Sequence, residues 1–276
     1  MGHAEQQAIE LEVPFSLPEE AITAYRTVGH VRLSGVAAPA MVQAHRPVIQ
    51  EIVTNTVDAK NTQGRISDYS SLFLQVTNVW RLDDRARQFV LASRFAGIAA
   101  RLMGVSAVRI YHDQALFKPP GGKATPWHQD QFYWPLDTTH TITMWMPLVD
   151  VTSAMGTMSF ADGSHRDGPL LARSISESTH REFEALIADR GYRVSHYDTL
   201  QAGDATFHAG WTVHSAHANR SPSPREVLTV IYYADGTQIK EPENEYQVAD
   251  LAVFHPGQHP GEPAASALNP LIRFTS

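Results

Sequence analysis

Two side chains able to bind a metal ion stand two residues apart in the segment Trp127-His128-Gln129-Asp130. In an extended segment this spacing places the imidazole of His128 and the carboxylate of Asp130 on one face. These groups are two of the three ligands in the 2-His-1-carboxylate triad that holds non-haem Fe(II). The pattern has low specificity alone, because a histidine two residues before an acid occurs five times, at His3, His128, His165, His180 and His196.

Three of the other pairs have a simpler explanation than metal binding. The pairs beginning at His3, His165 and His180 fall in the N-terminal tail, in a polar turn and on a helical face, where they are expected at the surface. His196 and Asp198 fall on a predicted strand and are the serious rival of the first pair.

The third ligand must come from a distant part of the chain, and two histidines compete for this role. His208 and His214 both follow the turn Gly203-Asp204, each in or beside a short predicted strand. Either imidazole could face inward, so the strand pattern around them leaves the choice open.

Arg225 stands just before the apolar run 227–233. A guanidinium at the mouth of a buried strand is costly unless it meets an anion, and its planar fork matches a carboxylate. His128, Asp130, His214 and, 11 residues later, Arg225 therefore form one consistent order along the chain. This order indicates a metal site beside an anchor for a carboxylate ligand.

The elements that precede this constellation are predicted to be largely helical. Three helices are expected in residues 1–104: from the capping box Ser16–Glu19 to about Val28, from Pro39 to about Lys60, and from the cap Asp83 to Gly104. The stretch Asn61–Trp80 between the last two is open between a substrate-facing loop and a connector with one short strand.

After residue 104 the pattern changes to short strands separated by Gly and Pro turns. Residues 141–146 alternate, with Ile142, Met144 and Met146 on one face and Thr141, Thr143 and Trp145 on the other. Many strands without a βαβ rhythm imply an antiparallel sandwich or barrel with the helices packed outside. One helical insert is expected at 178–190, and residues 237–276, with five prolines, are expected to wrap the domain and to be a candidate lid.

Composition excludes several kinds of site and partner. The 276 residues contain no cysteine, which rules out disulfides, thiolate-bound zinc, iron–sulfur clusters and a thiolate nucleophile. The net charge is −7 and no Lys/Arg run occurs, so neither nucleic acid nor an anionic membrane is an expected partner. Residues 1–10 lack the pattern of a signal peptide, and no apolar run reaches the roughly 20 residues that span a bilayer, so a soluble, cytoplasmic protein is expected.

The combined motifs resemble the phytanoyl-CoA dioxygenase family of Fe(II)/2-oxoglutarate-dependent oxygenases. The resemblance spans most of the chain and is carried by His128-Gln129-Asp130, Trp145, Gly163-Ser164-His165, Gly203-Asp204, His214, Asn219-Arg220-Ser221 and Arg225. It implies a mainly β fold with flanking helices and a double-stranded β-helix (jelly roll, cupin-like) core. It also implies a single domain over 1–276, with helical support in 1–104, the core in 105–236 and the wrapping tail in 237–276.

The resemblance assigns roles to residues of this chain. His128, Asp130 and His214 are expected to ligate iron, and Arg225 to hold the distal carboxylate of 2-oxoglutarate. Gln114 and Trp145 are expected to line the cosubstrate pocket, although core packing would also explain Trp145. Relatives often carry a hydroxyl residue two positions after the distal histidine, whereas this chain has Ala216 there and Ser215 before it, so a hydroxyl contact from this segment is not predicted.

The implied chemistry follows from the coordination. Three protein ligands leave three positions, of which 2-oxoglutarate takes two and O₂ takes one. Oxidative decarboxylation then gives succinate, CO₂ and a ferryl-oxo species that abstracts hydrogen from the substrate. Halogenating relatives have a small residue at the position of Asp130, so hydroxylation, epimerisation, desaturation or ring closure is expected instead.

The substrate is expected to be a small molecule, and a tailoring role in bacterial secondary metabolism, such as antibiotic biosynthesis, would suit the composition. An aromatic wall for a flat or hydrophobic substrate could come from Phe73, Trp80, Phe132, Tyr133 and Trp134, which core packing explains equally well. Two alternatives remain: a non-catalytic jelly-roll binding module, and a hydrolytic zinc site that has no need for Arg225. A monomer or a homodimer is expected.

Overall fold

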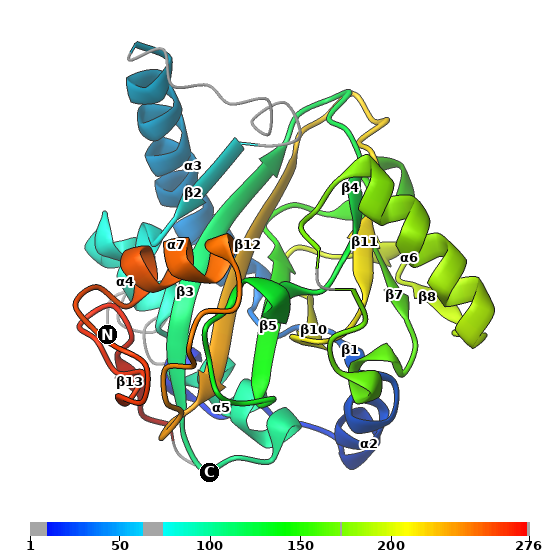
Figure 1. Ribbon diagram of the computed structural model, residues 1–276. Coiled ribbons are helices and arrows are strands. Elements are labelled where there is room, and N and C mark those ends of the chain that lie inside the picture. The colour runs from blue at the N-terminus through cyan, green and yellow to red at the C-terminus, as the bar shows by residue number, and fades with distance from the viewer. Residues whose placement is uncertain (1–9, 63–73, 172, 275–276) are drawn as a thin grey trace.

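Two antiparallel β-sheets lie opposite each other in the computed structural model, which describes residues 10–62, 74–171 and 173–274 (Figure 1). The larger sheet has the strand order β1-β10-β5-β12-β3, and β2 and β13 both pair with the outer side of β3. Its strands are β1 (His30–Leu33), β2 (Leu74–Thr77), β3 (Val108–Lys118), β5 (Thr141–Pro147), β10 (Ala205–Ala209), β12 (Arg225–Ala234) and β13 (Leu271–Ile272).

The smaller sheet has the order β4-β11-β7-β8, and a separate pair joins β6 to β9. These strands are β4 (Thr125–His128), β6 (Val151–Thr152), β7 (Met158–Ala161), β8 (Val194–His196), β9 (Thr199–Leu200) and β11 (His214–Ala216). The helices are α2 (Glu19–Val28), α3 (Pro39–Thr62), α4 (Asp84–Val90), α5 (Ser93–Met103), α6 (Glu177–Arg190) and α7 (Glu245–Phe254), with short 3₁₀ turns η2 (Val79–Arg81), η3 (Asp130–Tyr133), η4 (Ser153–Met155) and η5 (Ser164–Asp167). This is the jelly-roll architecture that was expected, mainly β with flanking helices.

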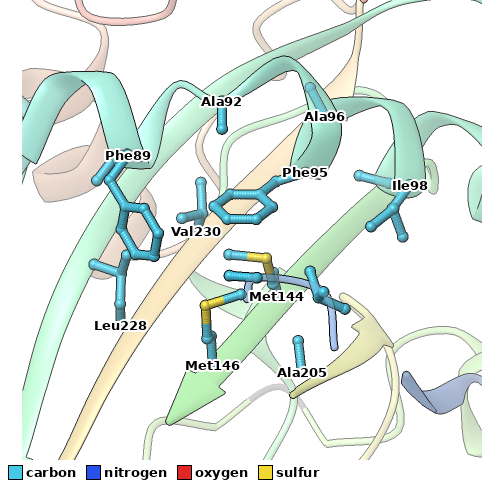
Figure 2. Packing of buried hydrophobic residues seen from close by; sticks show 14 of the residues in the cluster. Phe89, Ala92, Phe95, Ala96, Ile98, Met144, Met146, Ala205, Leu228 and Val230 are labelled. Carbon is cyan, nitrogen blue, oxygen red and sulfur yellow. The ribbon is translucent and has the colours of Figure 1, made fainter. Parts of the chain in front are cut away.

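The main hydrophobic core lies between the larger sheet and the N-terminal helices. Figure 2 shows Phe95 of α5 above Met144 of β5 and Val230 of β12, with Phe89 of α4 beside Leu228. The alternation predicted for β5 explains why one face of the sheet packs in this core and the other does not. Its even-numbered apolar residues enter the core, while Thr143 and Trp145 line the cavity on the opposite face of the sheet.

The inward face of the larger sheet is arranged in cross-strand rows. One row runs across four strands through His208, Thr143, Ile231 and His112. The next inward row, two residues further along each strand, holds Thr206, Trp145, Thr229 and Gln114. Arg225 pairs with Lys118 at the far end of β12 and β3. Residues 61 to 119 positions apart in the sequence are thus brought into neighbouring positions on adjacent strands.

Two predicted helix boundaries were wrong. The expected third helix is divided into α4 and α5, because Ala92 between them is extended (φ −55°, ψ 128°) and turns the chain. This turn lets Phe89 and Phe95 meet edge to face, with ring centroids 5.4 Å apart, over the sheet. The capping box is absent, since α2 begins at Glu19 and its cap, Pro18, makes no side-chain hydrogen bond. The predicted cap Asp83 and the predicted helix end at Gly104 were confirmed.

The C-terminal tail contains a helix that the sequence analysis did not predict. Asn244 caps α7 by accepting a hydrogen bond from the backbone N–H of Gln247. The side chain of Gln247 in turn donates to the carbonyl of Phe132, so α7 is fastened to η3 directly after the His-x-Asp motif. The tail therefore forms one wall near the candidate site.

Candidate metal centre and its cavity

The structure brings His128, Asp130 and His214 together. His128 ends β4, His214 begins β11, and the register pairs these two residues across the neighbouring strands. One carboxylate oxygen of Asp130, Oδ1, lies 3.4 Å from Nε2 of His128 and 3.6 Å from Nε2 of His214. Their ligand atoms all lie within 4.8 Å of one another, and this is the one such three-ligand group among the described residues.

Backbone carbonyls orient both imidazoles. Nδ1 of His128 donates to the carbonyl of Pro126 at 2.8 Å, and Nδ1 of His214 donates to the carbonyl of Thr212 at 2.9 Å. In a neutral imidazole, a proton held on Nδ1 in this way leaves Nε2 with the lone pair that a metal ion requires. Burial, then the neighbouring imidazole of His128, holds the pKa of His214 well below its usual value, so this side chain is neutral.

The second oxygen of Asp130 is held by the larger sheet. Oδ2 accepts hydrogen bonds from the Thr143 hydroxyl at 2.9 Å and from Nε2 of His208 at 3.2 Å. Burial alone would raise the pKa of Asp130, but the imidazoles of His214, His128 and His208 outweigh it and hold the pKa well below its usual value. The carboxylate is therefore ionised, with Oδ2 occupied and Oδ1 facing the two ligand histidines.

The geometry separates the two histidines that compete in the sequence. The rings of His208 and His214 lie 4.3 Å apart, but His208 contacts Oδ2 of Asp130, whereas His214 faces Oδ1. The rival histidine His196 lies elsewhere, with its ring bonded to the Ser159 hydroxyl at 2.8 Å. His208 thus supports the carboxylate, a role that sequence spacing alone did not separate from ligation.

The motif residues around these side chains hold the loops in place. Gln129 is buried and points away from its neighbours: its amide donates to the carbonyls of Gly168 and Trp211 and accepts from the N–H of Leu170. The hydroxyl of Ser164 accepts from the N–H of Val213, directly before His214.

The motif Asn219-Arg220-Ser221 fixes the turn that precedes Arg225. Asn219 donates to the carbonyls of Lys118 and Ser223 and accepts from Ser221. These bonds close the turn that leads into β12 and attach it to the end of β3. The chain therefore enters β12 with Arg225 as its first residue, opposite Lys118.

Arg225 is a buried cation, 2% exposed, at one end of the cavity. Its Nη1 donates to the carbonyl of Gly156, and its guanidinium lies 5.4 Å from the ring centre of Trp145. Nε finds no hydrogen-bond partner among the described residues. Burial lowers the pKa of Arg225 to about 10. No Asp or Glu among the described residues pairs with this guanidinium, and a buried charge is costly unless it meets an anion.

Lys118, which is fully buried, adds a second cation beside Arg225. Its Nζ donates to the carbonyl of His217 at 3.0 Å and lies 3.5 Å from the hydroxyl of Thr125. Burial, then the charge of Arg225, lowers the pKa of Lys118 to about 7. No role for Lys118 could be assigned from the sequence, because a lysine at the end of a strand is ordinarily a surface residue.

A cavity of about 330 Å³ joins the ligand group to Arg225. Gln114 and Trp145 both line it, on either side of Thr229 in the same cross-strand row. Thr125 also lines it and pairs directly with Ala216, so a hydroxyl group stands opposite the position where the sequence lacks one. Nothing in the sequence spacing could reveal this pairing, because a register shift interrupts the ladder between β4 and β11.

The aromatic residues considered for a substrate wall divide into three groups. Tyr133 and Trp134 line the cavity. Phe132 faces a separate hollow beside α7, and Trp80 packs in the main core with Arg87 over its ring, so neither belongs to the cavity wall. Phe73 lies outside the described residues. Gln75 and Thr77 of β2 line the cavity, so the end of the stretch 61–80 does face the site.

The donor set fits an Fe(II) ion with 2-oxoglutarate. Two imidazoles and one carboxylate leave adjacent positions open on the ion, and the buried Arg225 supplies the missing partner for a carboxylate. Helices in the described parts of the chain are too short or too polar to cross a membrane.

Comparison with known proteins agrees with this geometry. The phytanoyl-CoA dioxygenase (PhyH) family model matches residues 25–227. A probable alpha-ketoglutarate-dependent hypophosphite dioxygenase of Stutzerimonas stutzeri is 24% identical over 172 residues, which cover 60% of this chain and 58% of that protein.

Solved structures extend the comparison to nearly the whole chain. The non-heme alpha-ketoglutarate-dependent carbocyclase SnoK from nogalamycin biosynthesis is 27% identical, with a TM-score of 0.75 over 95% of this chain and 100% of that one. The epimerase SnoN, solved with Fe³⁺, alpha-ketoglutarate and nogalamycin RO, is 25% identical, with a TM-score of 0.75 over 92% and 98%. The chain belongs to the phytanoyl-CoA dioxygenase family, and its structural neighbours are Fe/2-oxoglutarate-dependent enzymes.

Proposed function

We propose that this protein is a non-haem Fe(II)- and 2-oxoglutarate-dependent oxygenase in which His128, Asp130 and His214 ligate the iron. The observation that carries the proposal is the way the two oxygens of Asp130 are used. Thr143 and His208 hold Oδ2, which leaves Oδ1 beside the Nε2 atoms of His128 and His214. Such support around a ligand fixes its orientation and strengthens metal binding.

Arg225 holds the distal carboxylate of 2-oxoglutarate. Its burial, its unpartnered Nε and its place at the end of the cavity support this role. Gln114 and Trp145 flank the cosubstrate between Arg225 and the iron, and Thr125 offers it a hydroxyl group. A non-catalytic binding module or a hydrolytic zinc site gives no reason to bury a guanidinium without an acid.

Iron with bound 2-oxoglutarate and O₂ supplies an oxidant able to remove hydrogen from a substrate, with succinate and CO₂ as the other products. The residues of this chain set the outcome by what they hold and exclude. The apolar and aromatic walls of the cavity keep water from the reacting atoms. Asp130 keeps a coordination position that a halide would need, which favours hydroxylation, epimerisation, desaturation or ring closure.

The substrate is a small organic molecule that binds in the part of the cavity beyond the cosubstrate. Tyr133 and Trp134 offer it an aromatic surface. SnoK and SnoN act in nogalamycin biosynthesis, and this supports a tailoring role in secondary metabolism. We further propose a cytoplasmic enzyme of one domain that works as a monomer or a homodimer.

The test is aerobic incubation with Fe(II), 2-oxoglutarate and a panel of small cyclic and aromatic compounds, with succinate as the readout. We expect His128→Ala and Asp130→Ala to abolish succinate formation. His196→Ala is the matched control and should retain it, because His196 lies outside the ligand group. Wild-type succinate yields from Asp130→Ala would refute the proposal.

A further inference from the structure

The cavity has a second polar end that the iron and its cosubstrate leave unused. Arg225 and Ile231 both line the cavity and stand six positions apart on β12, about 20 Å in an extended strand. Ile231 pairs with His112 on β3, and the helix α7 adds Asp250 and Phe254 to the same end (Figure 1). The cosubstrate anchor and this group therefore lie at opposite ends.

The carboxylate of Asp250 lines the cavity, and one hydroxyl group bonds to it. Its Oδ2 accepts a hydrogen bond from the Tyr111 hydroxyl at 2.9 Å. Within the described parts of the chain, no Lys or Arg forms an ion pair with it. Burial raises the pKa of Asp250 to about 7, although the bond from Tyr111 opposes the rise. The site therefore favours a partner that brings a hydrogen-bond donor and a positive charge.

His112 does not supply that charge. Its ring is 4% exposed and stacks on Phe254, with ring centroids 4.3 Å apart. Burial lowers the pKa of His112 to about 3, so the imidazole is neutral near pH 7. The remaining walls at this end are aromatic, from Tyr133, Trp134 and Phe254. Aromatic faces beside a carboxylate attract organic cations.

We propose that Asp250 is the recognition group for a substrate that carries a protonated amine on or beside a ring. The inference rests on the proposed function, because it assigns the substrate class of the same cavity. The ring packs against the aromatic walls, and the ammonium donates to Asp250. An anionic substrate, such as the hypophosphite named for one relative, would face the carboxylate of Asp250 at this end of the cavity, where it needs a cation.

Paired probes test the charge requirement. Mn(II) replaces Fe(II), so that no turnover occurs, 2-oxoglutarate is present, and benzylamine and benzyl alcohol are titrated into the full-length protein by calorimetry. Both probes carry the same ring, and only the amine is charged near pH 7. We expect benzylamine to bind about tenfold more tightly than the alcohol, because a buried hydrogen bond to a charged partner is stronger than one between neutral groups.

Three variants locate the preference. Asp250→Asn keeps the size of the side chain and an acceptor for Tyr111, and should abolish the preference for the amine. Tyr111→Phe removes the bond that anchors Asp250 but keeps the carboxylate, so the preference should remain. Glu245→Gln, on the exposed side of the same helix, is the matched control and should behave as the wild type.

Equal binding of the two probes, undetectable binding of benzylamine, or a preference that survives in Asp250→Asn would each overturn the inference. The same titrations report 2-oxoglutarate binding. If 2-oxoglutarate binds and the amine preference is missing, the inference fails and the proposed function stands. If 2-oxoglutarate itself does not bind, the proposed function fails.

Discussion

Replacing Arg225 by methionine should separate its role in ligand binding from any role in stability. The guanidinium is buried and pairs with no acid among the residues that the structure describes, so in the proposed complex the 2-oxoglutarate carboxylate completes its pairing. Breaking a buried charged pair costs about 3 kcal/mol or more, which corresponds to about a hundredfold in Kd. We therefore expect Arg225→Met to weaken 2-oxoglutarate binding about a hundredfold.

The free energy of unfolding of the metal-free protein should change little. The variant loses the hydrogen bond to Gly156 and the contact with Trp145, together about 2 kcal/mol. It also removes a buried charge whose pKa burial lowers from its usual value to about 10, which corresponds to roughly 3 kcal/mol. These effects oppose each other, so the variant should be about as stable as the wild type.

Arg46 provides a matched control with the opposite behaviour. It pairs with the buried Glu226, at 2.7 and 3.0 Å, on the outer side of the larger sheet. Arg46→Met leaves that carboxylate with Gln50 as its remaining side-chain donor in the described structure. We expect a loss of about 2 kcal/mol in stability and an unchanged Kd for 2-oxoglutarate.

Calorimetric titration of 2-oxoglutarate into the Mn(II)-loaded proteins gives the affinities, and urea unfolding of the metal-free proteins gives the stabilities. If Arg225→Met keeps its affinity within threefold and loses more than 2 kcal/mol of stability, Arg225 is a structural residue and the reasoning is refuted.

Three further predictions concern other parts of the structure. His208→Gln should weaken Mn(II) binding about tenfold to a hundredfold in direct titrations, because Asp130 loses a partner that orients it; unchanged affinity would remove His208 from the metal centre. The pKa of Lys118 is about 7 in the folded state and near 10.5 in the unfolded state, so charged Lys118 destabilises the native state. In urea unfolding, the stability of the wild type should therefore rise between about pH 7 and 10 relative to that of Lys118→Met. Parallel pH profiles of the two proteins would contradict this. Phe95→Ala should cost about 3–5 kcal/mol in the same assay and leave 2-oxoglutarate affinity unchanged, because Phe95 lies in the core behind the sheet; a loss of affinity of tenfold or more would show that the core and the cavity are coupled.

Where one face of an element is apolar, the sequence predicts the element well. The alternation in 141–146 identifies both the strand β5 and the residues that face the cavity, because Met144 and Met146 enter the core while Thr143 and Trp145 do not. Local capping is equally readable: Asp83 accepts from two backbone N–H groups at the start of α4, as its residue type predicts.

The helix α7 shows why the sequence does not predict some other elements. Its inward residues are polar, since Gln247 bonds to the η3 backbone and Asp250 lines the cavity, while Val248 and Val253 are each 56% exposed. A helix that turns polar groups inward has no apolar stripe, so the hydrophobic pattern that predicts helices is lost. The break between α4 and α5 is hidden for a different reason, because neither Leu91 nor Ala92 is a residue that ordinarily ends a helix.

The candidate site also contains residues that the sequence predicts and residues that it does not. The order of ligand residues and Arg225 can be read along the chain, because each belongs to a compact motif. The contacts of Lys118, Thr125, His208 and Asp250 depend on register and on packing between strands far apart in sequence. No spacing rule covers such contacts, and the structure is needed to find them.

The central claim, a single iron held by His128, Asp130 and His214, is tested most directly by anaerobic Fe(II) titration. We expect one Fe(II) per chain in the wild type and in His196→Ala, and no binding of comparable affinity in His128→Ala, Asp130→Ala or His214→Ala. Wild-type affinity and stoichiometry in Asp130→Ala would place the metal elsewhere and contradict the account.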